Sequence, residues 1–121
     1  MKHKSHSTSR RSILDRKYPC CKIYAVELSP EAYKHPGFLS ANPFYQTGQP
    51  CIYVGMTSLT PEQRLDVHRS GIGSPIVIRH GVRLRPDLIP RFSPKPRYQA
   101  MKLEREIARK LRANGFGVWQ H

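Results

Sequence analysis

The sequence predicts an α+β fold with a small, three-stranded, mostly antiparallel sheet flanked by helices. Short apolar runs rich in β-branched and aromatic residues are separated by turn residues, a pattern typical of strands. Two other segments carry start and stop signals of helices. The chain has 121 residues, enough to bury one hydrophobic core but not two. We therefore expect a single domain over residues 18–121.

The first half of the chain supplies two strands. The run Cys20–Leu28 is rich in strand-favouring residues, and Ser29-Pro30 after it favours a short helix or turn through Tyr33. A connection rich in Pro, Gly and Asn extends from His35 to Pro50. The second apolar run, Cys51–Gly55, follows it directly and predicts the second strand.

A capping box predicts the start of the first helix. The side chain of Thr60 can cap the helix, Pro61 suits its first position, and Gln63 can reach back to the Thr60 backbone. The helix should end near Ser70, because glycines follow it. One or two further strands are expected within Ile76–Leu84.

The second half ends in a long helix. Four prolines make the stretch before it an extended connection: Pro86, Pro90, Pro94 and Pro96. The helix is expected from Arg97 to Ala113, where apolar residues recur at helical spacing: Ala100, Leu103, Ile107 and Leu111. Asn114-Gly115 is a good stop signal, after which Phe116–Trp119 can return as a further short strand.

The charge of the chain points to a polyanionic partner. Lys and Arg number 21 against 8 Asp and Glu, a net charge of +13. Nucleic acid is the commonest partner of such a protein, and no membrane partner is expected, because the sequence lacks a long basic amphipathic helix. Residues 1–17 contain six bases and one acid with few aliphatic residues, which predicts a flexible basic N-terminal arm.

Hydropathy and cysteine usage indicate the compartment. No run of about 18 apolar residues occurs, and no hydrophobic segment follows the basic N-terminus, so neither a membrane span nor a secretory signal is expected. Cys20, Cys21 and Cys51 have no C-x-x-C spacing, which argues against a disulfide framework or a structural zinc site. We expect a cytoplasmic protein with reduced thiols.

One carboxylate stands out in the last helix. On a helical wheel Glu104 lies at the edge of the apolar stripe, between Ala100 and Ala108. It is either a boundary residue whose carboxylate reaches water, or a metal ligand or catalytic acid. Glu106 lies on the far side with lysines four residues before and after it, where solvated ion pairs explain it.

Arg64 and His68 are four residues apart in the first predicted helix and project from the same face. A guanidinium and an imidazole so placed can grip one phosphate. A solvated basic face that binds phosphate without specificity is the alternative.

These residues together resemble the GIY-YIG nuclease family. Lys22-Ile23-Tyr24 on one strand and Tyr53-Val54-Gly55 on the next resemble its paired signature. Arg64, His68 and the segment Ala100-Met101-Lys102-Leu103-Glu104 then follow in the order in which the family places an Arg, a His one turn later and an Ala-x-x-x-Glu. The similarity spans residues 21–119.

The chain departs from the family pattern at four points. Lys22 replaces the first Gly, and Tyr53 follows Tyr24 by 29 residues, so the first connection must hold an insertion. Met56 stands where many members carry Lys. Gln120 is the nearest replacement for the Asn of the closing strand.

The resemblance implies a metal-dependent endonuclease that hydrolyses phosphodiester bonds of nucleic acid, with DNA favoured over RNA. It implies that Tyr24 takes a proton from the attacking water, that Tyr53 orients this water or the phosphate, and that Arg64 holds the scissile phosphate. His68 would assist Tyr24 or contact phosphate. Glu104 would bind one divalent cation, Mg²⁺ or Mn²⁺, since such ions need few protein carboxylates.

Further contacts with nucleic acid are expected from Lys22, Gly55, Arg79, Arg83 and Arg85. The three arginines alternate in a strand-like run, so they would extend a phosphate-binding surface on one face, unless this is a merely solvated outer face. The alternative function is a non-catalytic basic nucleic-acid-binding protein. A small protein-binding or regulatory domain is a third class.

Overall fold

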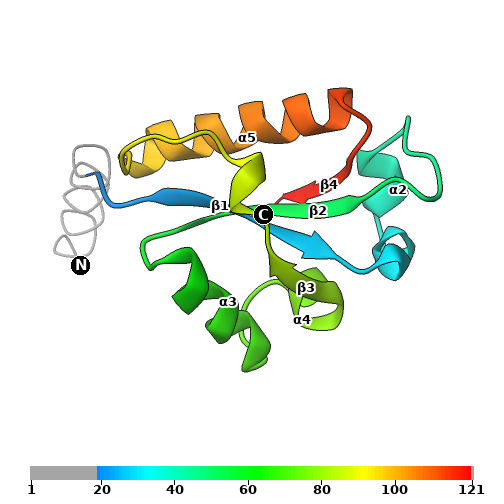
Figure 1. Ribbon diagram of the computed structural model, residues 1–121, viewed down its shortest axis with the longest axis horizontal. Helices are drawn as coiled ribbons and strands as arrows, with labels where there is room; N and C mark the ends of the chain where they lie inside the picture. The colour runs from blue at the N-terminus through cyan, green and yellow to red at the C-terminus, as the bar shows by residue number, and fades with distance from the viewer. Residues whose placement is uncertain (1–18, 121) are drawn as a thin grey trace, which may run out of the picture.

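A four-stranded mixed sheet forms the middle layer of the protein. The computed structural model describes residues 19–120, and Figure 1 shows helices on both faces of the sheet. The α+β class expected from the sequence is therefore confirmed. In chain order the strands are β1 (Lys22–Leu28), β2 (Cys51–Thr57), β3 (Gly81–Leu84) and β4 (Gly117–Gln120).

The strand order is β3-β1-β2-β4, with β1 and β2 in the centre. β1 pairs antiparallel with β2 and with β3, whereas β4 runs parallel to β2. The sheet has four strands and not the expected three, and the short strand expected at Phe116–Trp119 forms as β4 beside β2. The sheet is mostly antiparallel, as expected.

The helices frame this sheet. In chain order they are η1 (Pro30–Lys34), α2 (Phe38–Ala41), α3 (Pro61–Arg69), α4 (Pro75–His80), η2 (Pro86–Leu88) and α5 (Arg97–Ala113), where η marks a 3₁₀ helix. The expected bounds of α5 are confirmed, and those of α3 agree to within its last residue. The capping box is present, since the Gln63 N–H donates to Thr60 Oγ1 at 3.1 Å and the Thr60 N–H donates to Gln63 Oε1 at 3.0 Å.

Two segments differ from the sequence prediction. The strand expected within Ile76–Leu84 begins only at Gly81, because the first part of this run belongs to α4. Pro75 stands in the first turn of α4, and one short helical turn buries Ile76 as well as a strand would. The connection from His35 to Pro50 contains α2, whose Phe38 is fully buried.

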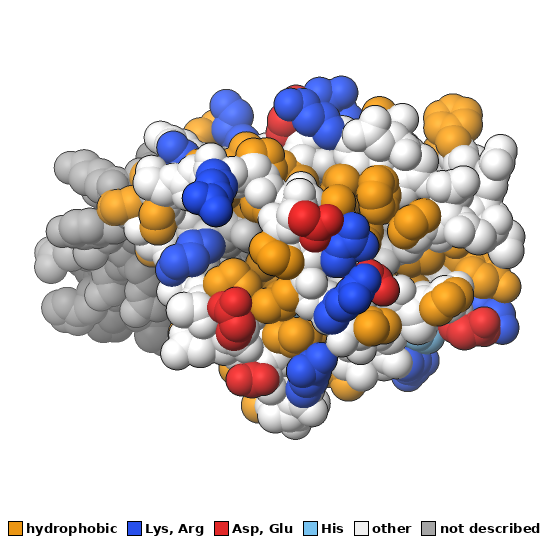
Figure 2. All heavy atoms as spheres, in the orientation of Figure 1, with side chains coloured by type: hydrophobic (Ala, Val, Ile, Leu, Met, Phe, Trp, Pro, Cys, Tyr) orange, Lys and Arg blue, Asp and Glu red, His pale blue; other side chains and the backbone are white. Residues whose placement is uncertain are grey.

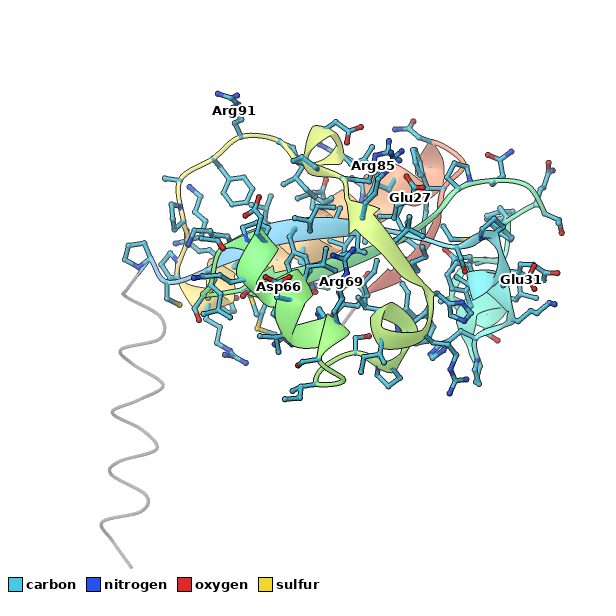
Figure 3. All side chains as sticks on the ribbon, turned by 60° about the horizontal axis from the view of Figure 1, so that its bottom comes forward. Glu27, Glu31, Asp66, Arg69, Arg85 and Arg91 are labelled. Atoms are coloured by element: carbon cyan, nitrogen blue, oxygen red, sulfur yellow. The ribbon has the colours of Figure 1, made fainter. Side chains whose placement is uncertain are left out.

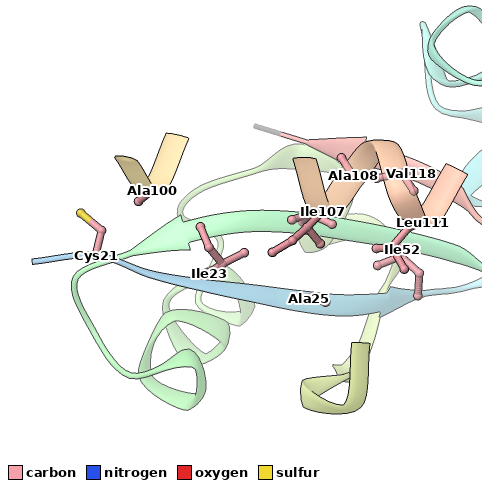
Figure 4. Close-up of a cluster of buried hydrophobic side chains, with 10 residues drawn as sticks. Cys21, Ile23, Ala25, Ile52, Ala100, Ile107, Ala108, Leu111 and Val118 are labelled. Carbon is pink, nitrogen blue, oxygen red and sulfur yellow. The ribbon is translucent and has the colours of Figure 1, made fainter. Parts of the chain in front are cut away.

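Hydrophobic side chains pack on both faces of β1 and β2. Figure 4 shows α5 lying across the sheet, where Ile107 and Leu111 pack with Ile23 and Ala25 of β1. The alternate residues of the same strand, Tyr24 among them, point to the other face and pack with residues of α3 and α4. The two central strands therefore carry one residue set for each face, and the tyrosines belong to the α3 face.

Other expectations concern the chain as a whole. Within the described residues, no helix is long and apolar enough to cross a membrane. Cys20, Cys21 and Cys51 form no disulfide with one another. The basic arm expected over residues 1–17 lies outside the described residues.

A buried asparagine of the long connection fastens the outer edge of β4. Asn42 is 5% exposed, and its amide behaves as a strand partner of Val118: Oδ1 accepts the Val118 N–H at 2.8 Å and Nδ2 donates to the Val118 C=O at 2.9 Å. Nδ2 also donates to the Phe38 C=O, and Oδ1 accepts from Arg112 Nε at 3.0 Å. The insertion is thus part of the folded core.

Replacing Asn42 with alanine should therefore lower the free energy of unfolding by about 2–4 kcal/mol, because a buried backbone N–H loses its partner. Urea denaturation measures this loss. Asn114→Ala is the matched control, since Asn114 is exposed after α5, and it should cost much less. Equal losses in the two variants would contradict the role given to Asn42.

Candidate active site

A buried hydrogen bond joins β1 to α3. Tyr24 Oη lies 2.8 Å from His68 Nε2, and the His68 side chain is fully buried. The other ring nitrogen, Nδ1, accepts the backbone N–H of Ser74 at 3.2 Å. Because a backbone N–H can only donate, Nδ1 carries no proton, and the neutral imidazole holds its proton on Nε2. His68 therefore donates to Tyr24 Oη.

This tautomer determines whether His68 can assist Tyr24 or contact a phosphate. Both ring nitrogens are engaged inside the fold, so assistance to Tyr24, not contact with a phosphate, is the role that the geometry favours. A donor aimed at the phenol oxygen favours the phenolate form of Tyr24. In this arrangement His68 stabilises negative charge on Tyr24 and does not accept its proton.

Gly73 makes the contact with Ser74 possible. Its φ of +117° lies in the left-handed region that side chains rarely adopt. A Cβ here would collide with the His68 ring and would stand 3.3 Å from Arg64 Nη2. The absence of a side chain lets the loop after α3 reach Nδ1, and it shows that Arg64 and His68 border the same small space.

Gly55 makes room for the two tyrosines. It lies directly opposite Tyr24 in the β1–β2 register, two residues after Tyr53 on β2. A Cβ at Gly55 would stand 2.7 Å from the Tyr53 ring and 2.9 Å from the Tyr24 ring. The ring centroids are 5.9 Å apart, and each ring also contacts that of His68. Gly55 thus acts as a spacer beneath two phenols.

Burial and nearby charges set the proton affinity of the phenols. Burial raises the pKa of Tyr24, while the Arg64 guanidinium acts in the opposite direction. Burial also raises the pKa of Tyr53, and the neighbouring Tyr24 adds to this effect. Tyr53 is consequently a persistent hydroxyl donor, and Tyr24 is the phenol with cationic and hydrogen-bonding support for its ionised form.

Glu104 is the buried carboxylate of α5. It is 6% exposed and lies between the buried Ala100 and Ala108, so the interpretation of a carboxylate reaching water is wrong. A charge on Glu104 raises the pKa of Tyr24 and of Tyr53. Among the described residues, β4 pairs with β2 from Cys51 to Val54, so Trp119 lies beside Tyr53.

The carboxylate itself is incompletely satisfied. Burial raises the pKa of Glu104 to about 7, against the lowering effects of Gln120 and Arg105. Within residues 19–120, Glu104 Oε2 is buried and has no hydrogen-bond partner. A buried polar atom without a partner is costly, which makes this oxygen a candidate ligand atom.

This arrangement fits a hard divalent cation better than zinc. No group of three or more His, Cys, Asp or Glu that could hold a metal ion occurs in the described part of the chain. A zinc site needs such a group, whereas Mg²⁺ is held by one or two carboxylates together with waters and substrate oxygens. Glu104 is compatible with the second kind of site.

The other predicted site residues do not lie in one place. Lys22 and Tyr24 border one hollow, and Arg64 borders another of about 450 Å³ together with Arg97. Arg79 was expected on a strand face with Arg83 and Arg85, but this expectation is wrong, because Arg79 lies in α4.

Acidic neighbours engage the two arginines near β3. Glu27 lies 3.1 Å from both Arg83 and Arg85, and Arg85 also lies 2.9 Å from Asp87. Figure 3 shows Glu27 and Arg85 side by side, and Figure 2 shows acidic and basic side chains interspersed on one face of the protein. Arg83 and Arg85 are therefore paired with acidic side chains, and they form a group separate from Lys22 and Arg64, which border the two hollows.

Three residues that support the cluster were not predicted as such. Ser74 and Gly73 orient His68, and the only sequence signal was a glycine after the helix. Gln120 lowers the pKa of Glu104, against the effect of burial, and its Oε1 accepts from Arg112 Nη1 at 3.3 Å. The family's Asn pointed to Gln120, but no signal pointed to Arg112.

Comparison of the chain with protein-family models, with curated proteins and with solved structures gives no match. The interpretation of the cluster therefore depends on its own geometry and on the motif residues.

The raised pKa of Glu104 predicts a pH-dependent gain in stability for Glu104→Gln. An unfolded Glu loses its proton near its ordinary pKa of 4.5, whereas the folded chain keeps the proton of Glu104 up to about pH 7. The stability that Glu104 contributes in its protonated form is therefore fully present below pH 4.5 and is lost as the pH rises through 7. Relative to the parent protein, the variant should gain about 2–3 kcal/mol between pH 4.5 and pH 8.

Urea denaturation in EDTA at several pH values measures this gain. Glu106→Gln is the matched control, because Glu106 is exposed on the same helix and pairs with Arg109. It should show no comparable gain. A constant difference between Glu104→Gln and the parent protein would contradict the buried, protonated carboxylate.

Proposed function

We propose that the protein is a metal-dependent endonuclease that hydrolyses phosphodiester bonds of nucleic acid, with DNA favoured over RNA. The observation that carries this proposal is the buried Tyr24–His68 hydrogen bond, and a buried carboxylate of α5 whose oxygen lacks a partner within the described chain supports it. The net charge of +13 supports a polyanionic substrate.

Tyr24 serves as the general base. A phenol with an ordinary pKa near 10 is a poor base at neutral pH, and burial weakens it further. Two groups counter this effect, since His68 Nε2–H donates to the phenol oxygen and Arg64 is a nearby cation. The phenolate form takes a proton from the attacking water, which then attacks phosphorus.

Arg64 and Tyr53 stabilise the negative charge on the phosphate. Negative charge grows on the phosphate oxygens and on the leaving oxygen in the transition state, so fixed donors aimed at these atoms lower the barrier. The Arg64 guanidinium can donate two parallel hydrogen bonds to a phosphate. Tyr53, which remains protonated, orients the water or the phosphate through its hydroxyl group.

Glu104 holds one divalent cation, Mg²⁺ or Mn²⁺, through its unpartnered oxygen. When bound, such an ion supplies positive charge to the phosphate and the leaving oxygen. The chain contributes the ionised carboxylate, and Gln120 favours this charged form by lowering the pKa of Glu104.

Cleavage should require both the metal and Glu104. Incubation of the protein with single-stranded and double-stranded DNA and RNA should yield products in Mg²⁺ and none in EDTA. Glu104→Gln should lower the rate by at least about 100-fold while binding is kept, and Glu106→Gln should stay close to the parent protein. Product formation is followed on denaturing gels, and binding by fluorescence anisotropy.

Two outcomes would contradict this proposal. Binding without cleavage of any of these substrates by the parent protein would favour the alternative, a non-catalytic nucleic-acid-binding protein. Equal cleavage by Glu104→Gln and by Glu106→Gln would remove the carboxylate from the reaction.

Tyr24→Phe tests the base directly. The ring and its packing remain while the hydroxyl is lost, so the cleavage rate should fall by about 100-fold or more. Tyr98→Phe is the matched control, since Tyr98 is 60% exposed on α5 and should leave the rate unchanged.

The rate of the parent protein should also rise with pH. The pKa of Tyr24 is raised above 10, so the phenolate fraction grows about tenfold for each pH unit between pH 7 and pH 9. Near-normal activity of Tyr24→Phe, or a rate independent of pH, would exclude the phenol as the base.

A further inference from the structure

An apolar cavity of about 380 Å³ opens beside Tyr24, along the edge of β1. β3 pairs with β1 only from Val26 to Leu28, and the chain returns to β1 at the bridge between Cys21 and Lys95. Between these two points the proline-rich segment 86–94 arches away from the strand, and the cavity occupies the gap.

The floor of this gap carries unused backbone hydrogen-bonding groups. Backbone groups of alternate residues point to the same edge of a strand. Cys21 uses this edge to pair with Lys95, and the Ala25 C=O accepts the Arg85 N–H at 2.8 Å. Ile23 lies between them, and its N–H and C=O have no backbone partner on that edge among residues 19–120. A ligand edge can therefore find both a donor and an acceptor there.

The walls suit a flat, apolar ring. Pro86, Ile89, Pro90 and Phe92 line the arch, and Phe92 offers an aromatic face for stacking. Glu62, in the first turn of α3, adds a carboxylate that can accept a hydrogen bond. Charged side chains stand at the mouth, where Figure 3 shows Arg91 pointing outward into solvent.

The hollow at the other end of the cluster has the opposite character. Arg64 and Arg97 line it, which suits a phosphate. Glu62 borders the cavity and Arg64, two residues later on α3, borders the hollow, while the neighbouring residues Lys22 and Cys21 border them in the same order, so the cavity and the hollow are adjacent. A ligand that combines an anionic group with a flat ring bearing donors and acceptors in two adjacent sites is a nucleotide.

We infer that the cavity between β1 and segment 86–94 holds one unpaired nucleobase of the strand whose phosphate lies at Arg64. The base stacks on Phe92, and its edge pairs with the backbone of Ile23. A paired base cannot enter such a cavity without leaving its stack. The substrate class is therefore single-stranded nucleic acid, or a duplex with an unpaired nucleotide beside the cleaved bond. This inference rests on the proposed function.

Glu62 adds a preference among the bases. A carboxylate accepts a hydrogen bond from an exocyclic amino group, such as that of cytosine, and repels the carbonyl oxygen that thymine and uracil carry at the same position. Cytosine should therefore be preferred over thymine or uracil in the cavity.

The first test measures binding alone. Full-length Glu104→Gln protein is titrated in EDTA with a labelled octanucleotide, with its duplex, and with the same duplex carrying a one-nucleotide bulge. The single strand and the bulged duplex should bind at least fivefold more tightly than the perfect duplex. Equal affinities would overturn the inference.

The second test locates the stacked base. Each position of the octanucleotide is made abasic in turn, and one position should weaken binding about 10-fold. Phe92→Leu, which keeps an apolar side chain but removes the ring, should abolish most of this loss when it is added to the Glu104→Gln protein. The inference would be overturned if an abasic position weakened binding equally with and without Phe92→Leu, or if no abasic position weakened binding.

The third test uses Glu62, whose exposed side chain is not needed for folding. The Glu104→Gln protein should bind oligo-dC more tightly than oligo-dT, and Glu62→Ala should remove this preference. Asp66→Ala, one turn later on the exposed face of α3, is the control and should keep it. A preference that survives Glu62→Ala, or is absent from the start, would overturn the assignment of Glu62.

Because these tests use binding in EDTA, they separate the two proposals. Absence of cleavage by the parent protein would remove the proposed function, even where the base-dependent binding is found. Cleavage in Mg²⁺ together with abasic losses unchanged by Phe92→Leu would keep the proposed function and remove the base-binding cavity.

Discussion

The hydrogen bond between Tyr24 and His68 is the contact on which the candidate site depends. It ties the central strand β1 to α3 inside a hydrophobic cluster, where an unpaired hydroxyl or ring nitrogen would be costly. Each nitrogen of His68 has a partner, and the Ser74 N–H selects the tautomer that donates to Tyr24. Since Arg64 lies one turn before His68 on α3, the bond that orients the phenol also places the guanidinium beside it.

The opposite side of the site is held by a second polar network. The Asn42 amide fastens the edge of β4, and Arg112 joins Asn42 to Gln120, which in turn lowers the pKa of Glu104. The long insertion between the tyrosines is thus linked by hydrogen bonds to the end of β4. The small residues before and after Glu104 in the helix, Ala100 and Ala108, are buried in the core and let α5 pack closely on the sheet.

Local signals explain what the sequence could predict, and long-range pairing explains what it could not. The capping box and the helical spacing of apolar residues specified α3 and α5, because these features act within a few residues. The position of Gly55 was predicted from the motif Tyr53-Val54-Gly55. The parallel pairing of β4, the change from strand to α4 at Pro75 and the partner of His68 Nδ1 arise from contacts between distant segments, for which one sequence holds no periodic signal.

The surplus of positive charge is distributed unevenly in a way that bears on function. Glu27 pairs with Arg83 of β3, Asp87 with Arg85 directly after this strand, and Glu106 with Arg109 of α5, so these cations are already compensated within the fold. Arg64 and Arg97 border a hollow instead, and burial raises the pKa of the Glu104 carboxylate to about 7. Near neutral pH the buried carboxylate thus offsets little of the positive potential until a cation favours its ionised form. The positive charge of Arg64 and Arg97, together with the weak acidity of Glu104, favours a phosphate here more than the net charge of the chain does.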